Sequence, residues 1–99
     1  MITGPQCRAG RALVEVSRAK LALRSGIRES VIEEFERMID EPDPEAVAAL
    51  ERALQDLGAV FIDENGGGIG VRLKFTDSEA KRIARLEAEG GITATDIVP

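Results

Sequence analysis

Over the first 58 residues, apolar side chains recur every three or four positions, which is the period of an α-helix. Four segments follow this spacing, at residues 5–14, 17–25, 28–38 and 43–58. Their boundaries carry residues that favour helix ends: Pro5 and Pro44 in first turns, Ser17 and Asp43 as N-caps, and Gly26 and Gly58 as terminators. The pattern therefore predicts four helices in this part of the chain.

The third of these segments places its apolar and charged residues on opposite sides. On a helical wheel, one arc holds Val31, Ile32, Phe35, Met38 and Ile39. The other side holds Glu29, Ser30, Glu33, Glu36 and Arg37. This distribution predicts that the apolar arc is buried and that the acidic residues face solvent.

From residue 59 onward the apolar period becomes strand-like. The segments "AVFID" and "IGVRLKF" flank the glycine-rich "ENGGG", which predicts a β-hairpin over residues 59–75. Thr76 and Glu79 then have the spacing of a capping box, so a short helix is expected through about Glu89, followed by an extended tail. The predicted fold class is mainly α, in one domain: four helices at residues 1–58, the hairpin at 59–75, and the short helix and tail at 76–99.

Composition narrows the classes of function. The 99 residues include 13 basic and 18 acidic side chains, a net charge of −5, and one cysteine with no histidine. Without histidine, neither an ordinary zinc site nor a nucleophile paired with a general base can be assembled. We therefore expect no metal, no cofactor and no enzymatic activity. A single cysteine excludes an internal disulfide, and no apolar run is long enough to span a membrane, which together favour a cytoplasmic protein.

The segment "SRAKLALRSGIRESVIEEFER" resembles the helix-turn-helix of the Cro/lambda-repressor-like family, as found in small bacterial regulators of the xenobiotic-response-element type. The residues that carry the resemblance are Ser17, Ala22, Gly26, Ile27, Ile32, Phe35 and Glu36. Three positions depart from the family pattern: Arg18 stands in place of a glutamine, Arg28 in place of a serine cap, and Met38 in place of a glycine. The resemblance implies a repressor-like helix-turn-helix bundle of four helices with an appended hairpin.

The resemblance further implies a small transcriptional regulator that binds double-stranded DNA, typically as a homodimer on two half-sites. It assigns phosphate contacts to Arg18, Lys20 and Arg28. It places Glu29, Ser30, Glu33 and Glu34 on the base-facing side of the third helix. For the contact between two copies, the hairpin edge or the surface of the fourth and fifth helices is available.

The distribution of charge leaves a second interpretation open. Residues 8–28 hold six basic side chains against one acidic, whereas residues 29–56 hold two basic against ten acidic. The basic half favours contact with phosphates, and the acidic third helix favours a basic protein partner. The alternative function is a protein-interaction module on the same fold, anti-activator or antitoxin-like, that does not bind DNA itself.

Overall fold

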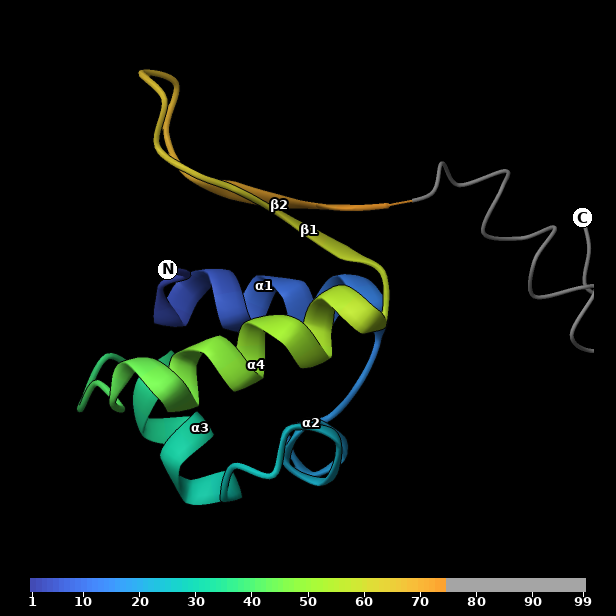
Figure 1. The fold of residues 1–99 in the computed structure, drawn as a ribbon, viewed down its shortest axis with the longest axis vertical. Coiled ribbons are helices and arrows are strands. Elements are labelled where there is room, and N and C mark those ends of the chain that lie inside the picture. Colours follow the sequence, from blue (N-terminus) through green and yellow to red (C-terminus); the bar gives the residue numbers. More distant parts are fainter. Residues whose placement is uncertain (75–99) are drawn as a thin grey trace, which may run out of the picture.

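Four helices and a two-stranded antiparallel hairpin make up residues 1–74, the part of the chain that the computed structural model describes (Figure 1). The elements are α1 (Gly4–Val14), α2 (Arg18–Ser25), α3 (Glu29–Glu36), α4 (Pro44–Asp56), β1 (Ala59–Ile62) and β2 (Gly70–Leu73). The four predicted helices and the predicted hairpin are confirmed. The helix predicted from Thr76 to Glu89 and the predicted tail beyond it lie outside the described residues.

Side chains at the helix ends satisfy backbone N–H groups that a helix leaves without partners. The hydroxyls of Thr3 and Ser17, and the carboxylate of Asp43, each accept from the backbone N–H three residues later. Gln6 completes a capping box, because its side-chain oxygen accepts from the Thr3 backbone N–H. This box starts α1 at Gly4, one residue before the predicted start, and each such cap contributes about 1 kcal/mol.

The apolar faces of the helices meet in one core, in which α4 packs against α1, α2 and β1. Leu50 and Leu54 of α4 are fully buried, together with Leu21 of α2 and Ile32 of α3. Phe35, one turn further along α3, is buried as the sequence predicts. Because these side chains come from three different helices, their burial holds the helices in one arrangement.

The hairpin covers α1 on the side away from α2 and α3 (Figure 1). Its strands pair antiparallel in the register Ala59–Leu73, Val60–Arg72, Phe61–Val71 and Ile62–Gly70. Phe61 packs on α1 where Gly10 leaves room, since a Cβ on Gly10 would lie 3.1 Å from the ring. The Gln6 side-chain amide donates to the carbonyl oxygens of Ile62 and Gly70, at 3.3 and 2.8 Å. The helix α1 therefore holds both strands.

The chain after α3 departs from the predicted burial. α3 ends at Glu36, whereas the sequence predicts a helix to Met38 with Met38 and Ile39 on its buried arc. Met38 instead has φ 61°, in the left-handed region, and the side chains of Met38 and Ile39 are 75% and 60% exposed. The prediction for these two residues is wrong, because a helical wheel holds only while the backbone is helical.

The N-terminal segment lies close against α3. Ile2 is buried in the core. The start of α1 approaches Phe35 so closely that a Cβ on Gly4 would overlap the Phe35 carbonyl oxygen. The contact between α1 and α3 thus requires glycine at this position.

We expect Gly4→Ala to lower the free energy of unfolding by about 3 kcal/mol, because relieving the overlap forces α1 and α3 apart. The matched control is Gly67→Ala in the hairpin loop, where an added Cβ meets only a side-chain oxygen at 3.5 Å. That control should change the free energy by less than about 0.5 kcal/mol. Urea denaturation measures both, and a Gly4→Ala variant as stable as the wild type would contradict the close approach.

Candidate nucleic-acid interface

The helices α2 and α3 are joined by a turn that packing holds in place. α2 ends at Ser25 and α3 begins at Glu29. Between them, Gly26 has φ 78°, a left-handed conformation that glycine adopts without a Cβ clash. Ile27 then packs, partly buried, against the core. The direction of α3 relative to α2 is therefore fixed by the anchored turn and by the buried face of each helix.

Of the three residues expected to contact phosphates, two are exposed: Lys20 on α2 and Arg28 at the start of α3. Arg18 is directed inward, since its Nε donates to Glu36 Oε1 at 3.1 Å and its side chain is only 31% exposed. Arg24 on α2 is also exposed and adds a cation beyond the three residues assigned to phosphate contacts. The exposed positive charge of this region is thus carried by Lys20, Arg24 and Arg28.

The four residues expected to face DNA bases all lie on α3, but their surroundings differ. Glu29, Ser30 and Glu34 are exposed. Glu33 is partly covered, and its carboxylate accepts from Arg37 Nη1 at 3.2 Å in an i,i+4 ion pair. Glu29 lies in the first turn of α3, where the helix dipole favours a negative charge.

Glu36, expected on the solvent side of α3, is buried with a fully covered side chain. Its carboxylate accepts from Arg11 of α1 at two atoms, Nε at 2.7 Å and Nη2 at 2.8 Å, and also from Arg18. The expectation is wrong because Glu36 lies four residues after the buried Ile32, at the edge of the apolar arc, where arginines from two other helices reach it. The spacing of four residues places Glu36 beside the apolar arc, but its burial depends on Arg11, which no pattern in the sequence singles out.

The buried carboxylate shifts the pKa values of the groups around it. Burial alone would raise the pKa of Glu36, but the hydrogen bonds from Arg11 and Arg18 outweigh it, so the pKa is lowered and the group is ionised at neutral pH. Burial, and then the charge of Glu36, raises the pKa of the Cys7 thiol. Cys7 therefore stays protonated and donates to Glu36 Oε2 at 3.4 Å. These groups form an internal ion-pair cluster that contains no reactive thiolate.

The surface of α3 is less acidic than its sequence. Of its four glutamates, Glu36 is internal and Glu33 is paired with Arg37. Of the four, Glu29 and Glu34 are exposed and make no salt bridge with another described residue. Lys20, Arg24 and Arg28 on α2 and the turn are also exposed, and their three positive charges outnumber these two negative ones. The surface of α2 and α3 therefore carries no net negative charge.

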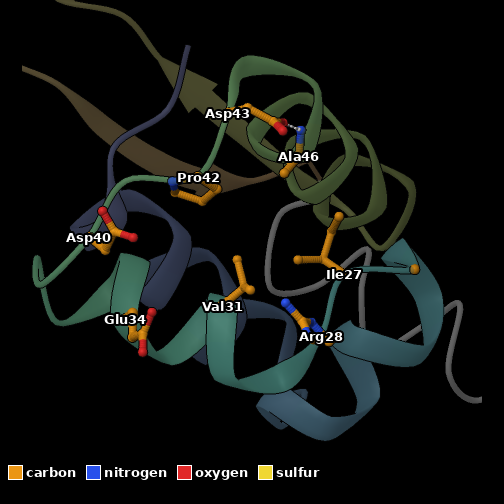
Figure 2. Close-up of a pocket in the computed structure, with 9 residues that line it drawn as sticks. Ile27, Arg28, Val31, Glu34, Asp40, Pro42, Asp43 and Ala46 are labelled. Carbon is orange, nitrogen blue, oxygen red and sulfur yellow. Dashed lines mark hydrogen bonds between the residues drawn. The ribbon is translucent and has the colours of Figure 1, made fainter.

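A groove of about 330 Å³ lies between α3, the turn before it and the start of α4 (Figure 2). It is lined by the apolar residues Ile27, Val31, Pro42 and Ala46 and by the charged residues Arg28, Glu34, Asp40 and Asp43. Figure 2 shows Arg28 at the end of the groove near α2, with Glu34 and Asp40 at the opposite end. Asp43 is engaged as the N-cap of α4, through its bond from the Ala46 N–H. The groove is thus apolar inside with a mostly acidic rim.

No model of a known protein family matches the chain, and no curated protein matches it significantly. Within residues 1–74, no helix combines the length and the apolar character needed to cross a lipid bilayer. The surface chemistry of α2 and α3 is therefore the basis for a functional assignment.

We expect Glu36→Gln to lower the free energy of unfolding at pH 7 by about 3 kcal/mol, because Arg11 and Arg18 lose the carboxylate that compensates their charge. The matched control is Glu34→Gln on the exposed side of α3, which should change it by less than about 0.5 kcal/mol. Urea denaturation of each variant measures both values.

The pH dependence of this effect tests the role of the charge. Because folding lowers the pKa of Glu36, its ionised form stabilises the fold fully above the ordinary glutamic acid pKa of about 4.3. This stabilisation is lost as the pH falls through that value towards the lowered pKa. The stability difference between wild type and Glu36→Gln should therefore shrink between about pH 5 and pH 3. A constant difference over this range would show that the charge is unimportant.

Proposed function

We propose that the chain is a small DNA-binding transcriptional regulator in which α2, the turn and α3 act as a repressor-like helix-turn-helix. The observation that carries the proposal is the exposed polar face of α3 beside three exposed cations, Lys20, Arg24 and Arg28. The opposite face of α3 is anchored in the core by Ile32 and Phe35. A helix held in this way presents its polar face rigidly, as reading a major groove requires.

Contacts to DNA divide into those that position the protein and those that read bases. Lys20 and Arg28 take the positioning role, because exposed cations displace the counterions of phosphates. Arg18 acts indirectly, by holding Glu36 inside the fold. Ser30 and Glu29 take the reading role at the start of α3, since a carboxylate accepts a hydrogen bond from the amino group of cytosine.

The exposed glutamates of α3 favour binding to the correct DNA site over binding to random DNA. Phosphates repel a carboxylate on any DNA sequence, whereas a carboxylate opposite a cytosine amino group gains a hydrogen bond at that site alone. Glu29 and Glu34 therefore weaken binding to random DNA more than binding to the correct site. The cations of α2 and the turn attract the DNA phosphates and so offset the repulsion from these glutamates.

The groove of Figure 2 favours a second function, a protein-interaction module on the same fold. Its apolar lining, with Val31 and Pro42, and its acidic rim, with Glu34 and Asp40, suit a basic and partly apolar segment of another protein. In that case α3 docks a protein and does not enter DNA. An anti-activator or antitoxin-like protein would use α3 in this way.

We expect the double variant Lys20→Ala/Arg28→Ala to bind operator and random DNA more weakly. The slope of log K against log salt should fall by about two units, because each lost phosphate contact removes about one. The control is Arg72→Ala on the hairpin, which lies across α1 from α2 and α3 (Figure 1) and should leave both quantities unchanged. Fluorescence anisotropy with labelled fragments, including the chain's own promoter, at several salt concentrations measures the slope.

We expect Glu29→Gln/Glu34→Gln to tighten binding to random DNA and to lower the ratio between operator and random binding, because two repulsive charges are removed. The same anisotropy series measures this ratio. Should the wild type bind no DNA at low salt while the double variant loses a co-purifying basic protein, α3 is a docking surface and the second function holds.

A further inference from the structure

Three large apolar side chains are exposed together where the N-terminus meets the loop after α3, at the left end of the molecule in Figure 1. They are Met1, Met38 and Ile39, which are 69%, 75% and 60% exposed. We call them the end patch. All three line one hollow, together with the buried Ile2 and Phe35. A group of exposed apolar side chains of this kind on a small protein marks an interaction site.

The exposure of Met38 is built into the backbone. Its φ of 61° is a left-handed conformation that glycine and asparagine adopt more readily than methionine. Backbone hydrogen bonds hold the loop in this form, from Met38 N–H to the Phe35 carbonyl at 3.1 Å and from Ile39 N–H to the Glu34 carbonyl at 2.8 Å. These two bonds form the cap that ends α3, in which a left-handed residue satisfies the last carbonyls of the helix, and this turn directs the Met38 side chain into solvent.

Charges of opposite sign flank the end patch. The hollow that the patch lines is also lined by Asp40 and Glu41. Met38 lines a second, neighbouring hollow as well, and there the charged residues at the surface are Arg8 and Arg37. Met38 thus borders one hollow with two carboxylates and another with two arginines, of which Arg37 also pairs with Glu33.

We propose that the end patch is the interface between two copies of this chain, related by a two-fold axis close to Met38. Rotation about this axis brings the Arg8 and Arg37 side of one copy onto the Asp40 and Glu41 side of the other. The apolar centre is then covered and both charged rims meet opposite charges. A partner of a single charge sign, such as DNA or a basic peptide, is repelled on one side of the patch.

This interface differs from the hairpin edge and from the surface of the fourth and fifth helices, which the sequence offered for dimer formation. It does not rest on the proposed function, because the end patch is defined without reference to DNA. It stands on the exposure of Met38 and on the arrangement of charge around it.

Met38→Asn tests the apolar centre, because asparagine is polar yet tolerates the left-handed backbone. We expect the wild-type chain to form dimers in sedimentation equilibrium without DNA, and the variant to raise the dissociation constant about tenfold or more. Circular dichroism of Met38→Asn should show unchanged helix content. The controls are Leu23→Asn on α2, 83% exposed, and Ile69→Asn beside the hairpin, 49% exposed. Both should leave the dissociation constant unchanged.

Charge reversal tests the two-fold arrangement. Arg8→Glu and Glu41→Arg should each raise the dissociation constant, and the double variant should restore it, because opposite charges then meet again across the axis. The proposal is overturned by a wild type that stays monomeric up to about 1 mM, by a dimer that Met38→Asn leaves intact, or by a dimer that Ile69→Asn abolishes. Since no DNA is present, these outcomes do not bear on whether α3 binds DNA.

Discussion

The arrangement of the first three helices depends on the hydrogen bonds that the carboxylate of Glu36 accepts. It lies at the end of α3 and accepts from Cys7 and Arg11 of α1 and from Arg18 at the start of α2. A buried charge is stable only when it is paired and hydrogen-bonded, so this one group requires all three helices to keep their places. The two-atom contact with Arg11 also restricts the angle at which α1 meets α3.

The same cluster shapes the surface that we propose meets DNA. By joining Glu36 to Arg18, it withdraws one acidic and one basic side chain from the exposed face. What remains outside is a nearly balanced surface, with Lys20, Arg24 and Arg28 exposed on α2 and the turn and Glu29 and Glu34 exposed on α3. An acidic third helix is therefore compatible with phosphate contacts, because the acidity that repels a phosphate is that of the surface alone.

The proposed DNA-binding surface and the end patch lie on separate parts of the molecule. Glu29 and Glu36 lie at the two ends of α3, about 10 Å apart along the helix, and Met38 follows just beyond. The hairpin lies on the side of α1 away from α2 and α3, and the Gln6 side chain holds it there. Contact with DNA along α3 and contact between copies at the end patch thus use different side chains. One copy presents both surfaces at the same time.

By itself the sequence determined the four helices and the hairpin of residues 1–74. Ser17, Gly26 and Asp43 act on backbone within a few residues, and the helical period alone places Lys20 and Glu29 on solvent-facing sides. Only the tertiary structure decided that Glu36 lies inside, because its partner Arg11 is 25 residues away along the chain. It also decided that Met38 lies outside, because α3 ends at Glu36, and that position 4 must be glycine, because the Phe35 carbonyl lies against it. These features depend on where elements end and on what distant segments bring to them, and no local pattern of residues carries that information.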